Sequence, residues 1–153
     1  MTDGVAAEID PLALESQVCF ALAVTNRAVL AVYRPLLEPL GLTHPQYLVM
    51  LALWDNAKGA GEPLSVKDIA RLLQMDSATL SPMLKRLQAQ GRITRVELAP
   101  KGRSLRRQAL EVPPSVVERL GVELSELEHL RDALTSINTA ALAAGALDSE
   151  LDR

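Results

Sequence analysis

The sequence predicts a mostly helical protein of one domain. Its 153 residues are enough for a single hydrophobic core. Apolar residues make up 48% of the chain and aromatic residues only 3%, and the apolar set is mostly Leu, Ala and Val. Leu and Ala lose little side-chain freedom in a helix, so this composition is typical of an all-α fold. Cap residues followed by apolar residues at helical spacing recur along the chain and indicate the same class.

The N-terminal third predicts a long helix followed by a turn. Ser16 is placed to cap a helix that runs toward Tyr33. Pro35, Pro39 and Gly41 then disturb and end it.

A second helix is predicted after this turn. Thr43 is its cap, and Pro45 lies in its first turn. The run 47–54 is almost unbroken in apolar residues, which predicts a helix buried on most sides. The glycines and proline of 58–63 then predict a loop.

Two short helices joined by a tight turn come next. Ser65 and Asp68 form a capping box for the first, Asp76 caps the second over 77–90, and Gly91 stops it. This is the pattern of a helix-turn-helix, although alone it is common in helical folds. The residues expected to face the core are Val66, Ile69, Ala70 and Leu73 in the first helix, and Leu80, Met83, Leu84 and Leu87 in the second.

The outward face of the second short helix predicts contact with DNA. Small hydroxyl residues gather at its N-terminal end, where a recognition helix meets base edges. Lys85 and Arg86 follow, where they reach phosphates or guanine, and Pro82 suits a thymine methyl. The alternative is an ordinary solvated face. The candidate DNA-binding residues are Ser77, Thr79, Ser81, Pro82, Lys85, Arg86 and Arg95.

The distribution of charge supports a polyanionic partner. The whole chain has a formal net charge of −3. The segment 67–107 holds ten basic residues and three acidic ones, a net charge of +7, so the remainder carries −10. A segregated positive segment in an acidic chain predicts binding to nucleic acid, and the alternative is an unevenly charged solvated surface.

The sequence predicts a short β-hairpin, or wing, after the second short helix. The segment 93–98 alternates and contains β-branched residues. Between Arg92 and Ala99 there is no Gly, Pro, Asn or Asp for a turn, and there are few residues for two strands and a loop. Either the wing is nearly absent, with two strand stubs joined near Arg95 and Val96, or a mobile wing tip is missing between the stubs. We favour the second.

The C-terminal region predicts a long amphipathic helix. Ser125 and Glu128 form a capping box before it. The helix is longer than a small core needs, so we expect it to form a subunit interface together with the first helix. The alternative is a terminal helix packed on its own domain. Its apolar residues are Leu127, Leu130, Leu134, Ile137, Ala141 and Ala144.

Several function classes are not expected. Cys19 is the only cysteine, which precludes an internal disulfide and suits the cell interior. We find no basic leader and no apolar run of about 20 residues, so neither a signal peptide nor a membrane span is expected. The two histidines, His44 and His129, show no metal-ligand spacing, and there is no Gly-rich phosphate loop. No cofactor, metal or catalytic site is therefore expected, and His129 is interpreted as a surface residue.

Several stretches together resemble the organic-hydroperoxide-sensing (OhrR-like) repressors of the MarR family, in their one-cysteine type. The similarity extends over about 16–110. The stretches are Gln17–Leu22, Tyr33–Thr43, Pro45–Met50, and Asp76-Ser77 through Leu84–Leu87.

This resemblance implies a winged helix-turn-helix protein that forms an intertwined homodimer through its N- and C-terminal helices. The chain is then a single MarR-type domain over 1–153. Segments 16–40 and 112–147 hold the dimerisation helices, and 43–110 is the DNA-binding region. The resemblance also implies repression of a peroxide-detoxifying gene, with a pseudo-palindromic operator in double-stranded DNA as partner.

In this family a cysteine at the position of Cys19 senses the hydroperoxide. With Ser16 as cap, Cys19 is the third residue of its helix, where free amides and the positive end of the helix dipole stabilise a reactive thiolate. Oxidation gives a sulfenic acid. Without a second cysteine, this acid combines with a low-molecular-weight thiol, forms a sulfenamide or oxidises further. The alternative is a small buried hydrophobe.

The family also holds the thiolate with tyrosine hydroxyls contributed across the dimer. Tyr33 matches one of these tyrosines, whereas His44 and Ala23 stand where two others are usual. His44 is a group of another kind with its own titration, and it would hydrogen-bond to the thiolate or pair with it. The Asp and Arg pair of the MarR-type wing has no counterpart that we can place.

Two rival functions remain. One is a MarR-type repressor that binds a small aromatic or acidic ligand between its DNA-binding and dimerisation regions, with His44 and Ala23 enlarging the pocket. The other is a one-cysteine thiol peroxidase, which needs a fixed donor such as Arg near the thiolate. Arg27 lies two turns after Cys19 and Arg34 lies farther still, so neither matches. We therefore expect a cytoplasmic regulator and not an enzyme.

Overall fold

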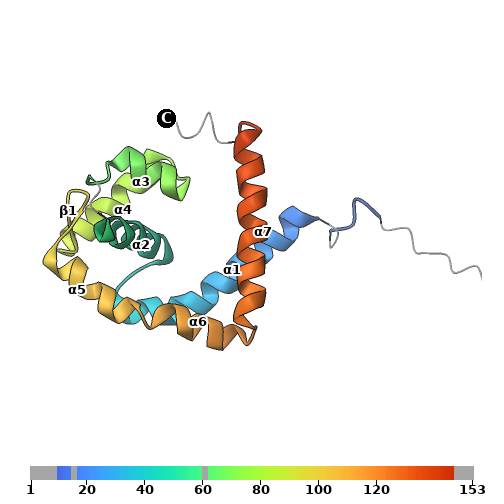
Figure 1. The fold of residues 1–153 in the computed structure, drawn as a ribbon, viewed down its shortest axis with the longest axis horizontal. Coiled ribbons are helices and arrows are strands. Elements are labelled where there is room, and N and C mark those ends of the chain that lie inside the picture. The colour runs from blue at the N-terminus through green and yellow to red at the C-terminus, as the bar shows by residue number, and fades with distance from the viewer. Residues whose placement is uncertain (1–9, 15–16, 60–61, 147–153) are drawn as a thin grey trace, which may run out of the picture.

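The computed structural model describes residues 10–14, 17–59 and 62–146 and confirms a mostly helical fold with one small β-hairpin. Figure 1 shows the path of the chain. The elements are α1 (Val18–Leu37), the 3-10 helix η2 (Glu38–Leu40), α2 (His44–Lys58), α3 (Val66–Leu73), α4 (Ser77–Ala89), β1 (Ile93–Thr94), β2 (Glu97–Leu98), α5 (Pro100–Ala109), α6 (Val112–Leu120) and α7 (Leu124–Ala143).

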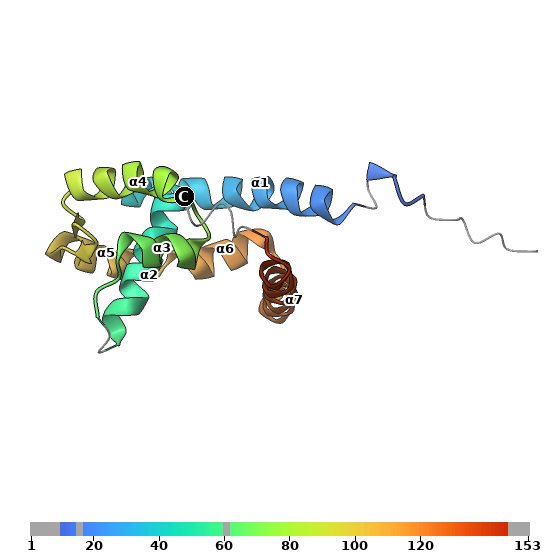
Figure 2. The ribbon, with the colours of Figure 1, turned by 90° about the horizontal axis from the view of Figure 1, so that it is seen from above.

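The elements fall into a lobe and two long helices that leave it. Helices α2 to α5 and the hairpin surround one core, and α6 packs along α1. Figure 2 shows α1 extending past α6 and away from the lobe, with α7 running across the direction of α1. No residue of α7 is buried in the single chain.

The core of the lobe follows the predicted faces of the two short helices. Leu80, Met83, Leu84 and Leu87 of α4 are buried, as are Ile69 and Ala70 of α3. Helix α2 contributes Val49 and Met50, which have no exposed surface. Trp54 ties α2 to α5, because its indole Nε1 donates a buried hydrogen bond of 2.9 Å to the carbonyl oxygen of Gly102.

Three predicted helix starts are confirmed. Thr43 and Gln46 form a reciprocal capping box at α2, and Ser65 and Asp68 form one at α3. The Asp76 carboxylate accepts a hydrogen bond of 2.7 Å from the amide of Thr79 at α4. Each cap satisfies backbone donors that a helix leaves free at its start.

Two other expectations about helix starts are wrong. The box of Ser125 and Glu128 does not form, because α7 begins two residues earlier than that cap requires, with Glu123 at the N-cap and no side-chain cap. The end of the first helix is confirmed, because α1 includes Pro35 in its last turn and stops at Leu37, before Pro39 and the left-handed Gly41. The first helix starts at Val18 with Gln17 at the N-cap, and Ser16, the predicted cap, lies outside the described residues.

The wing is a very short hairpin, and the expectation of missing tip residues is wrong. Ile93 pairs with Leu98 and Thr94 with Glu97 in antiparallel register. Arg95 and Val96 alone connect the strands, as the other alternative predicted. Arg95 takes a left-handed conformation with φ 61°, which supplies the turn without Gly or Asn.

Helix α1 also corrects the expectation that no segment is long and apolar enough for a membrane span. Residues Val18–Leu40 meet that test by length and composition. One such helix is weak evidence for a membrane, because mostly buried core helices and signal sequences pass the same test, and 6% of this window is buried in the single chain. Helix α1 carries Arg27 and Arg34, and its apolar side chains continue onto a groove shared with α6 and α7.

The packing of α5 predicts that Gly102→Ala destabilises the protein. A Cβ at Gly102 would lie 2.0 Å from the carbonyl oxygen of Arg92, so the backbone of α5 or of Arg92 must shift to admit it. We expect a loss of about 1–3 kcal/mol in the free energy of unfolding, the usual cost of overpacking. Urea unfolding followed by the fluorescence of Trp54 measures it. Ser104→Ala, at an exposed position of the same helix, is the control, and equal stability of the two variants would contradict the packing.

Candidate redox site and DNA-binding surface

Three aromatic rings meet where the end of α1 packs on the start of α2. The ring centroids of Tyr33 and His44 are 5.1 Å apart with an edge-to-face angle of 72°. Tyr47 completes the group, at 6.0 Å from Tyr33 and 6.2 Å from His44. We call these three residues the ring cluster. The structure thus brings together two of the three predicted redox-site residues.

Local structure fixes the positions of these rings. His44 is the first residue of α2, directly after the Thr43 cap, and Tyr47 lies three residues later on the same side of the helix. Tyr47 was predicted as part of a buried run but not as a site residue. The spacing of three from His44 was the signal in the sequence, and it becomes informative only once Tyr33 is known to pack there.

Burial sets the protonation of the cluster. It raises the pKa of Tyr33, and it raises the pKa of Tyr47 with a further contribution from the charge of Tyr33. Burial lowers the pKa of His44 below its ordinary value of 6.5. At neutral pH both phenols therefore keep their protons and His44 is a neutral imidazole. The cluster offers hydrogen-bond donors to an anion but no positive charge.

Cys19 lies far from the ring cluster in the same chain. It is exposed, and it is the second residue of α1 rather than the third. Fourteen residues separate Cys19 from Tyr33, which is about 21 Å along a straight helix. Ala23 is exposed and lies one turn after Cys19 on α1. It therefore also lies away from the cluster, which is at the other end of the helix. One chain therefore does not bring the thiol to these rings.

The long helices leave apolar side chains uncovered in the single chain. Val18 and Leu22 of α1 are exposed, and Ile137 of α7 is 53% exposed. A cavity of about 850 Å³ lies between α1, α6 and α7, with Leu22, Tyr33, Leu127 and Leu134 among its lining residues. Exposed apolar surface at helical spacing on two neighbouring helices is typical of a subunit interface.

The predicted DNA-binding residues lie on the outward face of α4 and on the hairpin. Thr79, Pro82, Lys85 and Arg86 are exposed, and Ser77 and Ser81 are half-buried. Arg95 is exposed at the turn of the hairpin.

Two of the hydroxyls on α4 are engaged within the helix. The Thr79 hydroxyl donates to the Asp76 carboxylate at 2.9 Å, and the Ser81 hydroxyl donates to the carbonyl oxygen of Ser77 at 2.8 Å. The hydrogen bonds from Thr79 lower the pKa of Asp76. With their protons used internally, Thr79 and Ser81 present hydroxyl oxygens that accept hydrogen bonds outward.

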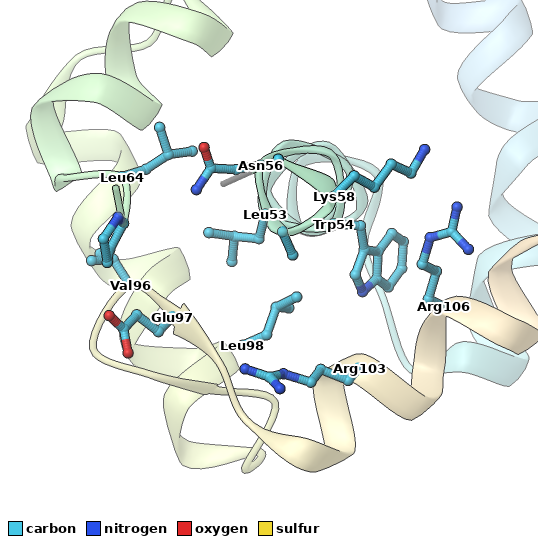
Figure 3. Close-up of a pocket in the computed structure, with 13 residues that line it drawn as sticks. Leu53, Trp54, Asn56, Lys58, Leu64, Val96, Glu97, Leu98, Arg103 and Arg106 are labelled. Carbon is cyan, nitrogen blue, oxygen red and sulfur yellow. The ribbon is translucent and has the colours of Figure 1, made fainter. Parts of the chain in front are cut away.

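A second cavity, of about 650 Å³, lies between the C-terminal end of α2, the hairpin and α5. Figure 3 shows Leu98 extending from the hairpin side toward Leu53 and Trp54 of α2. Arg103 and Arg106 extend from α5 along its side, and Lys58 lies at the end of α2. No sequence pattern had indicated this cavity, because its walls come from three segments far apart in the chain.

Comparisons with known proteins agree with this architecture. The model of the MarR family matches residues 40–104. The chain is 35% identical over 141 residues to the organic hydroperoxide resistance transcriptional regulator of Bacillus subtilis, covering 85% of this chain and 92% of that protein. The chain belongs to the MarR family of transcriptional regulators.

Other members of the MarR family are similar over comparable lengths. The chain is 40% identical over 139 residues to the HTH-type transcriptional regulator TtmR of Methylorubrum extorquens, covering 84% of this chain and 69% of that protein. The crystal structure of AbfR of Staphylococcus epidermidis matches with a TM-score of 0.67 at 27% identity, over 86% of this chain and 93% of that one. The regulator MosR of M. tuberculosis, solved in complex with DNA, has a TM-score of 0.69 at 21% identity, over 83% of this chain and 98% of that one.

Family membership settles the class of function. These MarR-family relatives are transcriptional regulators, so the expectation that the chain is not an enzyme is confirmed, and the thiol peroxidase rival is wrong. The segment matched by the family model begins at η2 and ends in α5. It contains His44, Tyr47 and the predicted DNA-binding residues, whereas Cys19 and Tyr33 lie before it.

The burial of His44 predicts a pH dependence of stability. Because its pKa is lowered in the folded chain, the unfolded chain binds the proton at a higher pH. The contribution of His44 to stability is therefore complete above about pH 6.5 and declines as the pH falls below that value. Urea unfolding at about pH 7.5 and pH 5.5 should show a smaller acid loss for His44→Gln than for the wild type. His129→Gln, on exposed α7, is the control, and an equal loss in all three proteins would contradict the assignment.

Proposed function

We propose that this MarR-family chain is a cytoplasmic, homodimeric repressor that binds double-stranded DNA when reduced and releases it when an organic hydroperoxide oxidises Cys19. The observation that carries the proposal is the distance along α1 between two groups. The exposed thiol of Cys19 lies at one end of the helix, and the ring cluster, with its hydrogen-bond donors, lies at the other. The name of the Bacillus subtilis relative, which refers to organic hydroperoxide resistance, supports the same signal.

A second copy of the chain would complete the site. Segments 16–40 and 112–147 are the proposed dimerisation helices, and their exposed apolar side chains are the surface that the copies bury. If α1 of one copy lies against α1 of the other in antiparallel fashion, Cys19 approaches the partner's Tyr33 and the partner's His44. The partner thus contributes residues that each thiol lacks in its own chain.

The chemistry of this composite site is a thiol oxidation. The Cys19 thiolate attacks the O–O bond of the hydroperoxide, an S–O bond forms, and the alkoxide leaves and takes up a proton to become an alcohol. The sulfur is oxidised to a sulfenic acid while the peroxide is reduced. Phenol and neutral imidazole donors of the partner stabilise the thiolate by hydrogen bonds rather than by an ion pair. A low-molecular-weight thiol then condenses with the sulfenic acid, which adds bulk to the interface.

DNA recognition would use the paired α4 helices. Two-fold symmetry places them in successive major grooves of a pseudo-palindromic operator, about 34 Å apart. Lys85 and Arg86 reach phosphates or guanine, and Ser77, Thr79, Ser81 and Pro82 lie nearest to the bases. The two-residue turn of the hairpin leaves Arg95 as its candidate contact, so the major groove carries most of the recognition.

A ligand-responsive repressor is the second candidate. The cavity between α1, α6 and α7 lies among the proposed dimerisation helices rather than between them and the DNA-binding region, and it is lined by Tyr33. It is lined by neither His44 nor Ala23, the two residues predicted to enlarge such a pocket. Release of DNA by a small aromatic acid from a Cys19→Ser variant would favour this candidate.

The proposal predicts a reversible response to peroxide. The reduced protein should bind the DNA upstream of its own gene and lose affinity at least about fivefold, the lower end of usual allosteric coupling, after one equivalent of cumene hydroperoxide. A thiol reductant should restore binding, and Cys19→Ser should abolish the response. Tight binding that ignores the oxidant would contradict peroxide sensing, and no binding at all would contradict the repressor function.

The surface of α4 predicts a strong dependence on salt. Arg86→Ala should weaken binding by about 1–3 kcal/mol, and it should reduce the slope of log K against log salt by about one if the contact is to a phosphate. A titration by fluorescence anisotropy at several salt concentrations measures both. Arg119→Ala removes a charge outside the positive segment and should leave the slope unchanged. Binding that does not vary with salt would rule out the phosphate contacts.

A further inference from the structure

Arg92 stands at the junction between the recognition helix and the hairpin. Its amide donates a hydrogen bond of 3.0 Å to the carbonyl oxygen of Leu87, which closes the last turn of α4. Its carbonyl oxygen accepts a hydrogen bond of 3.0 Å from the amide of Ala99, just after β2. The next residue, Ile93, begins β1 and is buried. The backbone of Arg92 is thus fixed to the end of α4 and to the base of the hairpin.

The side chain of Arg92 reaches in another direction, to the turn between α1 and α2. Nη1 donates to the carbonyl oxygen of Gly41 at 3.0 Å, and Nη2 donates to the carbonyl oxygen of Leu40. Burial lowers the pKa of the guanidinium, because part of the group is withdrawn from water. A planar fork can donate to two neighbouring carbonyls at once, which a lysine ammonium does less well.

Gly41 is adapted to this contact. Its φ of 65° is left-handed, and a Cβ there would lie 2.7 Å from Nη2 of Arg92. The left-handed backbone favours glycine at this position, and a side chain there would displace the guanidinium from its close approach. Gly41 and Arg92 form a matched pair that joins two segments about fifty residues apart in the chain.

A short segment of chain connects this pair with the ring cluster. Leu42 follows Gly41 and is buried, and Thr43 closes the capping box of α2 with Gln46. His44 of the ring cluster is the next residue. Among the hydrogen bonds of the described residues, those from Arg92 are the side-chain links between segment 38–43 and the junction of α4 with β1.

We propose that Arg92 is the positioning residue through which a change at the ring cluster reaches the recognition helix. The inference rests on the proposed function, because it takes the cluster as part of the sensor and α4 as the reader of DNA. When oxidation at the interface displaces the start of α2, segment 40–43 moves with it. The guanidinium transfers that displacement to the C-terminal end of α4, and the spacing of the two recognition helices changes.

The test separates DNA affinity, thiol oxidation and their coupling. Arg92→Met keeps the length and much of the packing of the side chain but cannot donate to the two carbonyls. We expect its reduced form to bind the operator DNA within about threefold of the wild type, and Cys19 to react with cumene hydroperoxide at the wild-type rate. The ratio of affinities between reduced and oxidised forms should fall toward one, whereas usual allosteric couplings are about 5- to 150-fold.

A conservative variant and a control make the result specific. Arg92→Lys keeps the charge and can donate to one of the two carbonyls at a time, so it should restore part of the ratio. It also serves as the second variant if Arg92→Met does not fold. Arg107→Met removes an exposed charge from α5 and should keep the wild-type ratio. Full release of DNA by oxidised Arg92→Met, or an equal loss of affinity in both of its forms, would overturn the inference. A wild-type protein that ignores peroxide would instead overturn the proposed function, and this coupling with it.

Discussion

The length and rigidity of α1 constrain the rest of the molecule. A straight helix cannot bring its own two ends together, so the thiol of Cys19 and the ring cluster at Tyr33 remain about 21 Å apart within one chain. The apolar side chains of α1 and α7 meanwhile stay exposed. The proposed second copy of the chain would solve both problems, because it would cover the apolar surface and carry its own cluster toward the thiol. The proposed function follows from that arrangement.

In the proposed dimer, the lobe would relate the subunit interface to the geometry of DNA binding. The buried side chains of Leu80 and Leu87 pack one side of α4 against the core, and the opposite side of the helix is left free for DNA. The end of α4 is held by hydrogen bonds of Arg92 rather than by apolar packing alone. Packed cores do not deform continuously, so a displacement near His44 shifts whole elements rather than fading within a few residues.

Local signals in the sequence predicted the helices of the lobe well. A cap such as Asp76 acts within one turn, and the inward face of α4 follows from helical spacing, so neither depends on the rest of the fold. One error arose where neighbouring residues compete for one role, because Glu123 takes the N-cap that Ser125 was expected to provide. Pro35 is accommodated in the last turn of α1, where it removes only one backbone hydrogen bond.

Features that depend on tertiary contacts could not be read from the sequence. In the sequence, Tyr47 is one residue of a buried run, and only the packing of Tyr33 on it marks it as part of a site. The left-handed backbone at Arg95 is not indicated by its residue type. Helix α5 was not anticipated, although Pro100 at its start and the spacing of Leu105 and Ala109 are signals for it. Of the candidate redox residues, Tyr33 and His44 were predicted together and lie together, whereas Cys19 lies away from them in the same chain.

Subunit mixing tests most directly whether the sensing site is built from two chains. One variant carries Cys19→Ser with an intact ring cluster, and the other keeps Cys19 but carries Tyr33→Phe and His44→Phe. Each homodimer lacks one half of every site. If the site is shared between subunits, the mixed dimer regains one complete site, and Cys19 should react with cumene hydroperoxide at close to the wild-type rate. If Cys19 in the mixed dimer stays as slow as in the Tyr33→Phe, His44→Phe homodimer, the shared site is contradicted.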